Sequence, residues 1–303
     1  MHAIRLTQLK SPLVDEEIED LVAGPGEAVV EIRAAGICHS DAHYRAGGGT
    51  VVLPLTLGHE IAGVIAGTDQ RVALHYLHDD GRMLGKEVDG GYAERIVVPV
   101  GNLVPIPDGV PFEVAAVMMC STATAYHALR LASLRGGESV AIIGFGGLGA
   151  SAAQLAKVMG AGKVFAVDRV RDKLDLAQSF GAIPAAVEEL RDVDVALDFA
   201  GHPATTLAAL RSLRRGGRIM IVAINLRELP IDPYRDILAN ERHIIGVSDH
   251  TRDELVELLA MAAQGQLDMT RVITRRVPLD AAAINGVLDD LDAGTAHLRT
   301  VIV

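Results

Sequence analysis

One short stretch, GICHSDAHYRAGGG at residues 36–49, concentrates side chains that can bind a metal or move a proton: Cys38, His39, Ser40, Asp41 and His43. The chain has only one other cysteine, Cys120 in MMCSTATAY, and the pair His59 and Glu60 occurs in LGHEIAG. Thiolates, imidazoles and carboxylates are the protein ligands of zinc. Spacing alone does not group these residues, however, and a buried, inert thiol is the ordinary explanation of a single cysteine. They form a candidate metal set that needs support from elsewhere in the chain.

A glycine-rich loop carries the second chemical signal. In VAIIGFGGLGASAAQLAK, Gly144, Gly146 and Gly149 stand in G-x-G-x-x-G spacing between a predicted strand and a predicted helix. These glycines permit a tight turn, a close backbone approach to a pyrophosphate and close packing of the helix, whose N-terminus supplies free N–H groups. A turn that needs glycine only for its backbone shape is the alternative. The surrounding strand-helix-strand pattern favours a dinucleotide site.

An acidic residue follows this loop at a suitable distance. The next predicted strand, KVFAVD, ends at Asp168, nineteen positions after Gly149. A carboxylate there can accept hydrogen bonds from both hydroxyls of an adenosine ribose and would repel a 2′-phosphate, so we expect NAD in preference to NADP. Arg169 beside it can pair with such a phosphate. In the alternative interpretation, Asp168 caps the following helix.

Charge and hydropathy exclude several classes of partner. The chain has 28 Lys and Arg against 39 Asp and Glu, a formal net charge of -11, and no basic run, so we expect no binding to nucleic acids or to anionic membranes. The longest uncharged apolar tract, residues 139–156, contains four glycines and is a poor candidate for a membrane span. The start, MHAIRLTQLK, predicts an edge strand and not a secretion signal, and we therefore expect a cytoplasmic protein.

Two patterns of predicted structure surround these residues. Over residues 1–110, short alternating or apolar runs separated by Gly and Pro predict an all-β, barrel-like region. A helix is predicted over 114–132, followed by the strands SVAIIG, KVFAVD, DVALDFAG and RIMIVA, with helices between them. The last of these helices is predicted over ATTLAALRSLRRGG, residues 204–217. This alternation predicts a doubly wound parallel sheet.

Together these motifs resemble the zinc-dependent alcohol dehydrogenases of the medium-chain dehydrogenase/reductase superfamily. The resemblance covers nearly the whole chain, from AAGICHSDAHYRAG through LPLTLGHEIAGVI, DGGYAERIVVP and CSTATAYHAL to the glycine loop and the closing LRTVIV. It implies an α/β protein with a GroES-like β catalytic domain at residues 1–120 and 249–303. It also implies a Rossmann NAD-binding domain, inserted at residues 121–248.

The resemblance implies a role for each member of the candidate metal set. Cys38, His59 and Cys120 match the catalytic zinc ligands, a Cys2His set already known from alcohol dehydrogenases that leaves the fourth tetrahedral position open. Glu60 matches a carboxylate that can approach or replace the fourth ligand. Asp41 matches the carboxylate that orients the ligating imidazole.

Further roles are implied for the proton relay, the cofactor site and the substrate pocket. Ser40 matches the hydroxyl that hydrogen-bonds the substrate oxygen, and His43 matches the outer end of a proton relay through the nicotinamide ribose. His39 and Arg299 match groups near the cofactor phosphates. Additional cofactor contacts are implied at Thr124, Gly147 and Leu148. The predicted pocket walls are Tyr76, Met119, Val51 and Val52.

Ordinary structural roles stay open for several of these residues. His39 and His43 could be surface histidines, while Ser40 and Asp41 could be helix caps. Arg299 could be an exposed strand residue. Cys120 could fill the core beside VAAVMM, where the methionines are expected to be core residues.

The chain departs from many members of this family in one place. Between RVALHYL and DGGYAE, those members carry a lobe whose four cysteines hold a structural zinc, whereas this chain has HDDGRMLGKEV and no cysteine. We therefore expect one catalytic zinc per chain and no structural zinc. The polar residues of this connection are better explained as a strand end and turn than as metal ligands: His75, His78, Asp79 and Asp80.

The resemblance implies oxidation of small alcohols to aldehydes or ketones by NAD, and the reverse reduction, through a zinc-stabilised alkoxide. It also implies a homodimer or homotetramer. One alternative is a zinc-free quinone or enoyl reductase on the same scaffold, which would have no reason to keep Cys38, His59 and Cys120 together. The other is a non-catalytic dinucleotide-binding protein, which would have no reason to keep Ser40 and His43.

Overall fold

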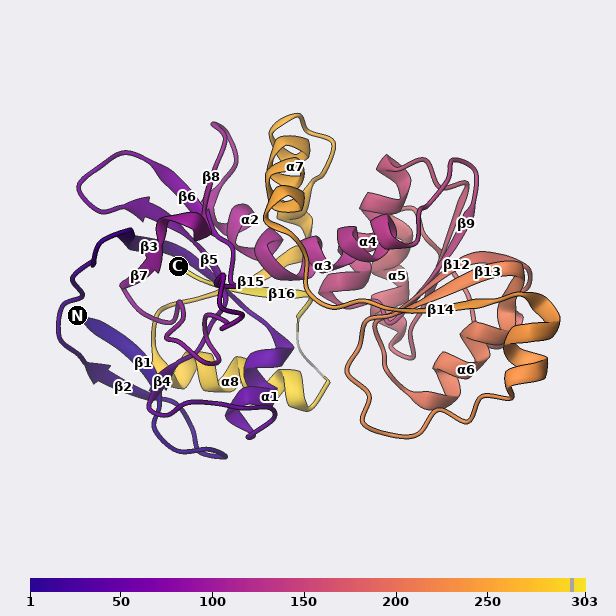
Figure 1. The fold of residues 1–303 in the computed structure, drawn as a ribbon, viewed down its shortest axis with the longest axis horizontal. Coiled ribbons are helices and arrows are strands. Elements are labelled where there is room, and N and C mark those ends of the chain that lie inside the picture. The colour runs from indigo at the N-terminus through magenta and orange to yellow at the C-terminus, as the bar shows by residue number, and fades with distance from the viewer. Residues whose placement is uncertain (295–296) are drawn as a thin grey trace. The chain divides into compact units, whose positions relative to one another are not determined.

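The computed structural model describes residues 1–294 and 297–303, which form two compact units (Figure 1). The first unit combines Met1–Ser121 with Arg252–Val303, and the second comprises Thr122–Thr251. Among the described residues, no helix is both long enough and apolar enough to cross a bilayer. The expected α/β class is confirmed, with one unit rich in antiparallel strands and one built on a parallel sheet.

The first unit consists mainly of β-strands, as the alternating runs predict. Its strands are β1 (His2–Leu6), β2 (Val14–Glu17), β3 (Glu27–Ile37), β4 (Leu55–Thr56), β5 (Glu60–Ile65), β6 (Arg71–Leu74), β7 (Arg95–Pro99), β8 (Leu103–Pro105), β15 (Ile273–Val277) and β16 (Arg299–Ile302). A seven-stranded sheet has the order β15-β16-β3-β5-β6-β8, with β7 also paired to β3, and a three-stranded sheet has the order β2-β1-β4. Among the described strands of this unit, only β15 and β16 run parallel to each other.

The described part of the first unit also contains the α-helices α1 (His39–Arg45), α2 (Phe112–Val117), α7 (Arg252–Ala263) and α8 (Ala281–Asp292). Helix α1 follows directly after Cys38 and packs against α8. Arg45 near its end donates hydrogen bonds to Asp289 and Asp292 of α8, at 2.7 and 3.2 Å. Helix α8 therefore holds the segment that carries the cluster at residues 38–43.

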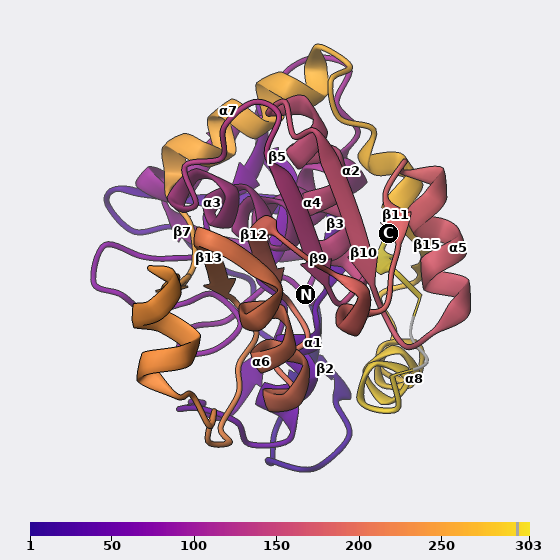
Figure 2. The same ribbon diagram turned by 90° about the vertical axis from the view of Figure 1, so that its right-hand side faces the viewer.

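The second unit is a six-stranded parallel sheet of order β11-β10-β9-β12-β13-β14, flanked by helices (Figure 2). Its strands are β9 (Ser139–Ile143), β10 (Lys163–Val167), β11 (Ile183–Pro184), β12 (Val193–Asp198), β13 (Leu213–Ile221) and β14 (His243–Gly246). Its α-helices are α3 (Ala123–Leu131), α4 (Gly147–Val158), α5 (Arg171–Ser179) and α6 (Pro203–Ser212). The order of the strands reverses between β9 and β12, which is where open α/β sheets bind ligands.

One predicted helix is too long. The helix expected over residues 204–217 ends at Ser212, and Leu213 begins β13 by pairing with Val193. Leu213 is 2% exposed, so burial in the sheet stabilises the extended conformation. Gly216 has a φ of +71°, which a helix does not allow, and the strand register shifts there.

Short 3-10 or π-helical segments occur at η1 (Val100–Asn102), η2 (Met118–Thr122), η3 (Val187–Glu189), η4 (Pro233–Ile237), η5 (Leu238–Asn240) and η6 (Met269–Val272). Of these, η2 matters most for the site, because it contains Cys120.

Candidate metal centre and nucleotide loop

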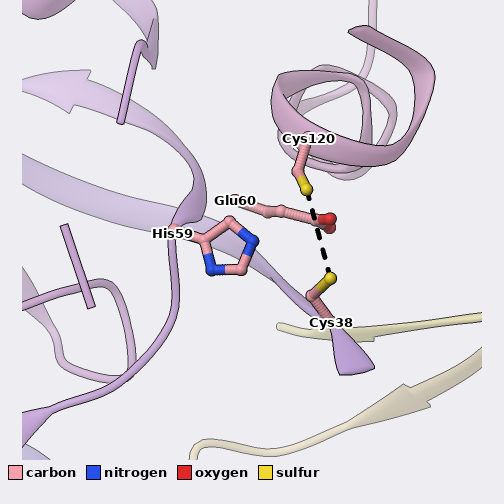
Figure 3. A group of neighbouring side chains, drawn as sticks. All are labelled: Cys38, His59, Glu60 and Cys120. Atoms are coloured by element: carbon pink, nitrogen blue, oxygen red, sulfur yellow. Dashed lines mark hydrogen bonds between the residues drawn. The ribbon is translucent and has the colours of Figure 1, made fainter. Parts of the chain in front are cut away.

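Three elements of the first unit bring four potential ligands together. Cys38 follows β3, which pairs antiparallel with β5 so that Glu60 lies opposite Gly36. His59 directly precedes Glu60, and Cys120 comes from the π-helical turn after α2. Figure 3 shows the four side chains pointing toward one another.

The spacing of these ligand atoms fits a zinc ion. One ligand atom from each of the four residues lies within 4.8 Å of all the others. The sulfur atoms of Cys38 and Cys120 are 4.0 Å apart, close to the roughly 3.8 Å that tetrahedral Zn–S bonds of about 2.3 Å imply. Oε1 of Glu60 is buried without a hydrogen-bond partner among the described residues. A cation would supply the partner that a buried carboxylate oxygen requires.

The two thiols differ in acidity. A hydrogen bond with Cys120 lowers the pKa of Cys38 well below its usual value, and His59 lowers it further. The hydrogen bond with Cys38, together with burial, raises the pKa of Cys120. Cys38 therefore ionises first, and a bound cation would displace the remaining proton, chiefly from Cys120.

A buried carboxylate holds the imidazole of His59. Its Nδ1 lies 3.2 Å from Oδ1 of Asp41, and the two side chains are 2% and 0% exposed. Burial lowers the pKa of His59, but the charges of Asp41 and Cys38 outweigh burial and raise the pKa well above its usual value. Asp41 also accepts a 2.8 Å hydrogen bond from the backbone N–H of Cys38, the N-cap residue of α1, and this contact is part of the helix cap. Asp41 thus combines the contacts of a helix cap with those of an imidazole-orienting group.

A buried ion pair lies beside the ligands. Glu60 pairs with Arg299 of β16, and their side chains are 0% and 5% exposed. Burial raises the pKa of Glu60 to about 7, although Arg299 opposes this shift. The alternative that Arg299 is an exposed strand residue is wrong, because β16 lies inside the sheet between β15 and β3. Its contact with the cofactor pyrophosphate stays a prediction.

The two predicted relay residues, Ser40 and His43, both lie on α1 but differ in exposure. The hydroxyl of Ser40 donates a 3.1 Å hydrogen bond to Sγ of Cys38 and so contacts the ligand set. His43, one turn along α1, is exposed, and its ring stacks on that of His39 with centroids 4.5 Å apart. His39 Nε2 lies 3.9 Å from a carboxylate oxygen of Asp292. The relay and phosphate-binding roles of these residues stay predictions.

The helix predicted over 114–132 is confirmed as a continuous run of α2, η2 and α3, but its middle turn is π-helical. A π-turn inserts an extra residue into a helix and is common at functional sites. Here it contains Cys120, and its own Ser121 donates a 3.2 Å hydrogen bond to the carbonyl of Val117. Apolar periodicity could not have revealed this irregular turn, because it assumes a constant 3.6-residue repeat.

Two of the four predicted pocket walls, Tyr76 and Met119, are core residues. Met119 is completely buried, and Tyr76 is 3% exposed, so neither presents a surface to a substrate in this structure. Tyr76 instead packs edge-on against the ring of His59, with centroids 5.5 Å apart. Val51 is half-buried, and Val52 is 54% exposed.

The glycine loop joins β9 to α4 in the second unit. Gly144 has a φ of +94°, and a side chain on Gly149 would overlap the carbonyl of Gly144, so the helix starts close against the turn. No atom lies within 4 Å of where a Cβ on Gly146 would be, which leaves its backbone open to approach. Gly146 is also the N-cap of α4, whose first residues are Gly147 and Leu148.

Asp168 follows β10 and contacts this loop. Its carboxylate accepts hydrogen bonds from the backbone N–H groups of Phe145 and Val170, at 2.8 and 2.9 Å. It therefore braces the glycine loop while remaining half-exposed. Arg169 is exposed, and Thr124 is half-buried in the first turn of α3.

The shortened connection after β6 forms a tight turn. The backbone N–H of His78 donates a 2.9 Å hydrogen bond to the carbonyl of Arg82, and Leu77 bridges to Met83. Asp80 accepts two hydrogen bonds from Arg82 inside this turn. This arrangement confirms the prediction of a strand end and turn.

One residue near the centre is not identified by the sequence argument. The hydroxyl of Tyr92 donates a 2.8 Å hydrogen bond to Oδ2 of Asp41. Tyr92 lies in DGGYAE, which is part of the family resemblance, but nothing in the local sequence indicates that it contacts a residue 51 positions away.

Two family models match most of the chain. Residues 24–108 match a model described as alcohol dehydrogenase GroES-like domain, and residues 147–264 match one described as zinc-binding dehydrogenase. An alcohol dehydrogenase of Geobacillus stearothermophilus is 35% identical over 100% of this chain and 99% of its own length. An NAD-dependent alcohol dehydrogenase of Sulfolobus acidocaldarius is 30% identical over 100% and 99%.

Solved structures show the same fold. The alcohol dehydrogenase of Aeropyrum pernix has a TM-score of 0.90 and 31% identity over 100% of both chains. Acetophenone reductase of Geotrichum candidum, in complex with NAD, has a TM-score of 0.88 and 26% identity over 99% of this chain and 96% of its own. A zinc-binding dehydrogenase of Sinorhizobium meliloti, bound to NADP, has a TM-score of 0.90 and 25% identity over 100% and 98%.

Proposed function

Because the chain belongs to the zinc-dependent alcohol dehydrogenases of the medium-chain dehydrogenase/reductase superfamily, we propose that it oxidises alcohols to aldehydes or ketones with NAD and catalyses the reverse reduction. The observation that carries this proposal is the cluster of Cys38, His59, Glu60 and Cys120, whose ligand atoms lie within 4.8 Å of one another. Two thiolates balance the charge of a divalent cation, which makes its burial tolerable.

Zinc at this site supplies Lewis-acid chemistry, which makes an alcohol hydroxyl easier to deprotonate and a carbonyl easier to reduce. Cys38, His59 and Cys120 would hold the ion. A carboxylate oxygen of Glu60 lies within 4.8 Å of the other three ligand atoms and would be available as a further ligand. Asp41 holds Nδ1 of His59, so that Nε2 remains the metal-binding nitrogen.

Ser40 and His43 handle the proton in this proposal. The Ser40 hydroxyl lies 3.1 Å from a ligand sulfur and is placed to receive the proton of a substrate hydroxyl. His43 is exposed one turn further along α1 and can exchange that proton with solvent.

NAD supplies the hydride acceptor for the oxidation. In our proposal the open backbone at Gly146 and the N–H groups at the start of α4 bind the pyrophosphate. The half-exposed carboxylate of Asp168 binds the ribose hydroxyls and disfavours NADP. A steady-state comparison of kcat/KM for the two cofactors tests this preference, and a higher value for NADP would contradict it.

We also propose that the enzyme is a homodimer or homotetramer acting on small molecules. Strand β14 ends its sheet and has one unpaired edge. Ile244 of this strand is 37% exposed, and Tyr234 and Leu238, which precede it in sequence, are each 67% exposed. A second copy would cover such groups. Light scattering should give a mass of two or four times 32.0 kDa, and a monomer would contradict this proposal.

The deciding experiment combines zinc analysis with turnover. Purified protein should contain about one zinc per chain and should reduce NAD with a panel of primary and secondary alcohols. Cys38→Ser should lose both zinc and turnover, while NADH fluorescence shows cofactor binding close to that of the wild type. Full activity of the variant, or activity only with quinones or enoyl compounds, would overturn the proposal.

A further inference from the structure

A buried tyrosine, Tyr92, lies behind the proposed metal ligands. Its side chain is 0% exposed, and its hydroxyl donates a 2.8 Å hydrogen bond to Oδ2 of Asp41. A tyrosine hydroxyl in the core normally has a partner, so the contact alone shows no function. Its partner, however, is the carboxylate that contacts a proposed zinc ligand.

The Asp41 carboxylate is held by donors from three separate stretches of chain. Its Oδ2 receives the Tyr92 hydroxyl and the backbone N–H of Cys38, both at 2.8 Å. Its Oδ1 lies 3.2 Å from Nδ1 of His59. With two donors on Oδ2, rotation of the carboxylate is restricted, and Oδ1 stays directed at the imidazole.

Tyr92 is itself fixed by its backbone, which pairs with β1 and with the segment that leads into His59. Its backbone N–H donates a 3.0 Å hydrogen bond to the carbonyl of Leu57, and its own carbonyl accepts one from Ile4 at 2.8 Å. A side chain on Gly58 would overlap the Tyr92 ring, because the ring packs directly on that glycine. Tyr92 therefore contacts the chain just before His59 as well as the carboxylate behind its imidazole.

We propose that Tyr92 is a positioning residue of the metal centre, which acts through Asp41 to orient His59 for zinc. The inference rests on the proposed zinc site. Outer partners of metal-binding histidines typically contribute 10–100-fold to metal affinity. Tyr92 contacts Asp41, and Asp41 contacts the zinc ligand His59. Because Tyr92 therefore acts on the ligand indirectly, we expect Tyr92→Phe to release zinc roughly ten-fold faster than the wild type, at the low end of this range.

The test measures transfer of zinc to a chromogenic chelator from the full-length enzyme. Tyr44→Phe is the matched control: Tyr44 lies on α1 beside Asp41, is half-buried, and makes no side-chain hydrogen bond among the described residues. Its zinc release should change less than about two-fold. The visible spectrum of cobalt-substituted Tyr92→Phe should also shift, because the imidazole is less well oriented. Equal zinc release and an unchanged cobalt spectrum would overturn the proposal.

A second comparison tests whether Tyr92 acts through Asp41. Adding Tyr92→Phe to Asp41→Asn should accelerate zinc release little beyond Asp41→Asn alone, because the carboxylate has already been lost. Fully additive effects would contradict the mechanism. Should Tyr92→Phe fail to fold, 3-fluorotyrosine can replace Tyr92, because it keeps the hydroxyl. Its fluorine resonance should shift when zinc is removed, and an unchanged resonance would refute the link between Tyr92 and the metal centre. Zinc content of the wild type separately decides the proposed function.

Discussion

Replacing Arg299 by methionine should destabilise the protein, and the loss should grow with pH. The side chains of Glu60 and Arg299 are 0% and 5% exposed, so the substitution leaves a buried carboxylate without its cation. Removing one partner of a buried ion pair typically costs about 3–5 kcal/mol of unfolding free energy. Glutamate can reduce this cost by taking up a proton, which makes the loss depend on pH.

The sign of the pH dependence follows from the Glu60 pKa. Burial raises this pKa from 4.5 to about 7 in the wild type. When the folded pKa of a carboxyl group is raised, the protein loses stability as pH rises from the unfolded pKa to the folded pKa. The unfolding free energy falls by about 1.4 kcal/mol per pH unit in this range, and it levels off well above the folded pKa. Without Arg299 the folded pKa moves above 7, so between pH 7 and pH 8 the variant loses more stability than the wild type. The difference in unfolding free energy should therefore grow by about 1 kcal/mol between pH 7 and pH 8, because the wild-type carboxyl group is still half protonated at a pKa of about 7.

Urea denaturation of the zinc-free proteins between about pH 6 and pH 8 measures this difference. Arg276→Met is the matched control, because it breaks the more exposed pair of Arg276 on β15 with Glu113, whose side chains are 53% and 27% exposed. That pair should contribute less than about 1 kcal/mol, with no trend in this range. A constant difference between Arg299→Met and the wild type from pH 7 to pH 8 would refute the reasoning.

Two further predictions concern packing and acid stability. Gly36→Ala places a Cβ that overlaps the Glu60 carboxylate and should destabilise the fold by about 1–3 kcal/mol. Gly101→Ala is the control, because a Cβ there meets no atom within 4 Å. Equal melting temperatures of the two variants would contradict the overlap. A hydrogen bond from Arg218 holds the pKa of Glu138 below its usual value, so its stabilisation is present above about pH 4.5 and is lost as pH falls through the folded pKa. Glu138→Gln should therefore lose less stability than the wild type on acidification in urea titrations; parallel curves would disprove this.

Local sequence predicts much of the second unit because its signals are short in range. Buried parallel strands appear as continuous apolar runs, as in the SVAII of β9, and the spacing of Gly144, Gly146 and Gly149 sets the geometry of a single turn. The end of α6 was predicted wrongly, because pairing of Leu213 with Val193 in the sheet outweighs local helix preference.

The metal centre depends on contacts between distant residues. Sequence alone supplied Cys38, His59 and Cys120 as candidates, and only family resemblance joined them into one set. In the structure, the antiparallel pairing of β3 with β5 and a π-helical turn bring two sulfurs 82 positions apart to within 4.0 Å. The contact of Arg299 with Glu60 depends on the pairing of β16 with β3, and the contact of Tyr92 with Asp41 joins residues 51 positions apart. Strand register and buried hydrogen bonds are properties of the packed chain, and no short window of sequence encodes them.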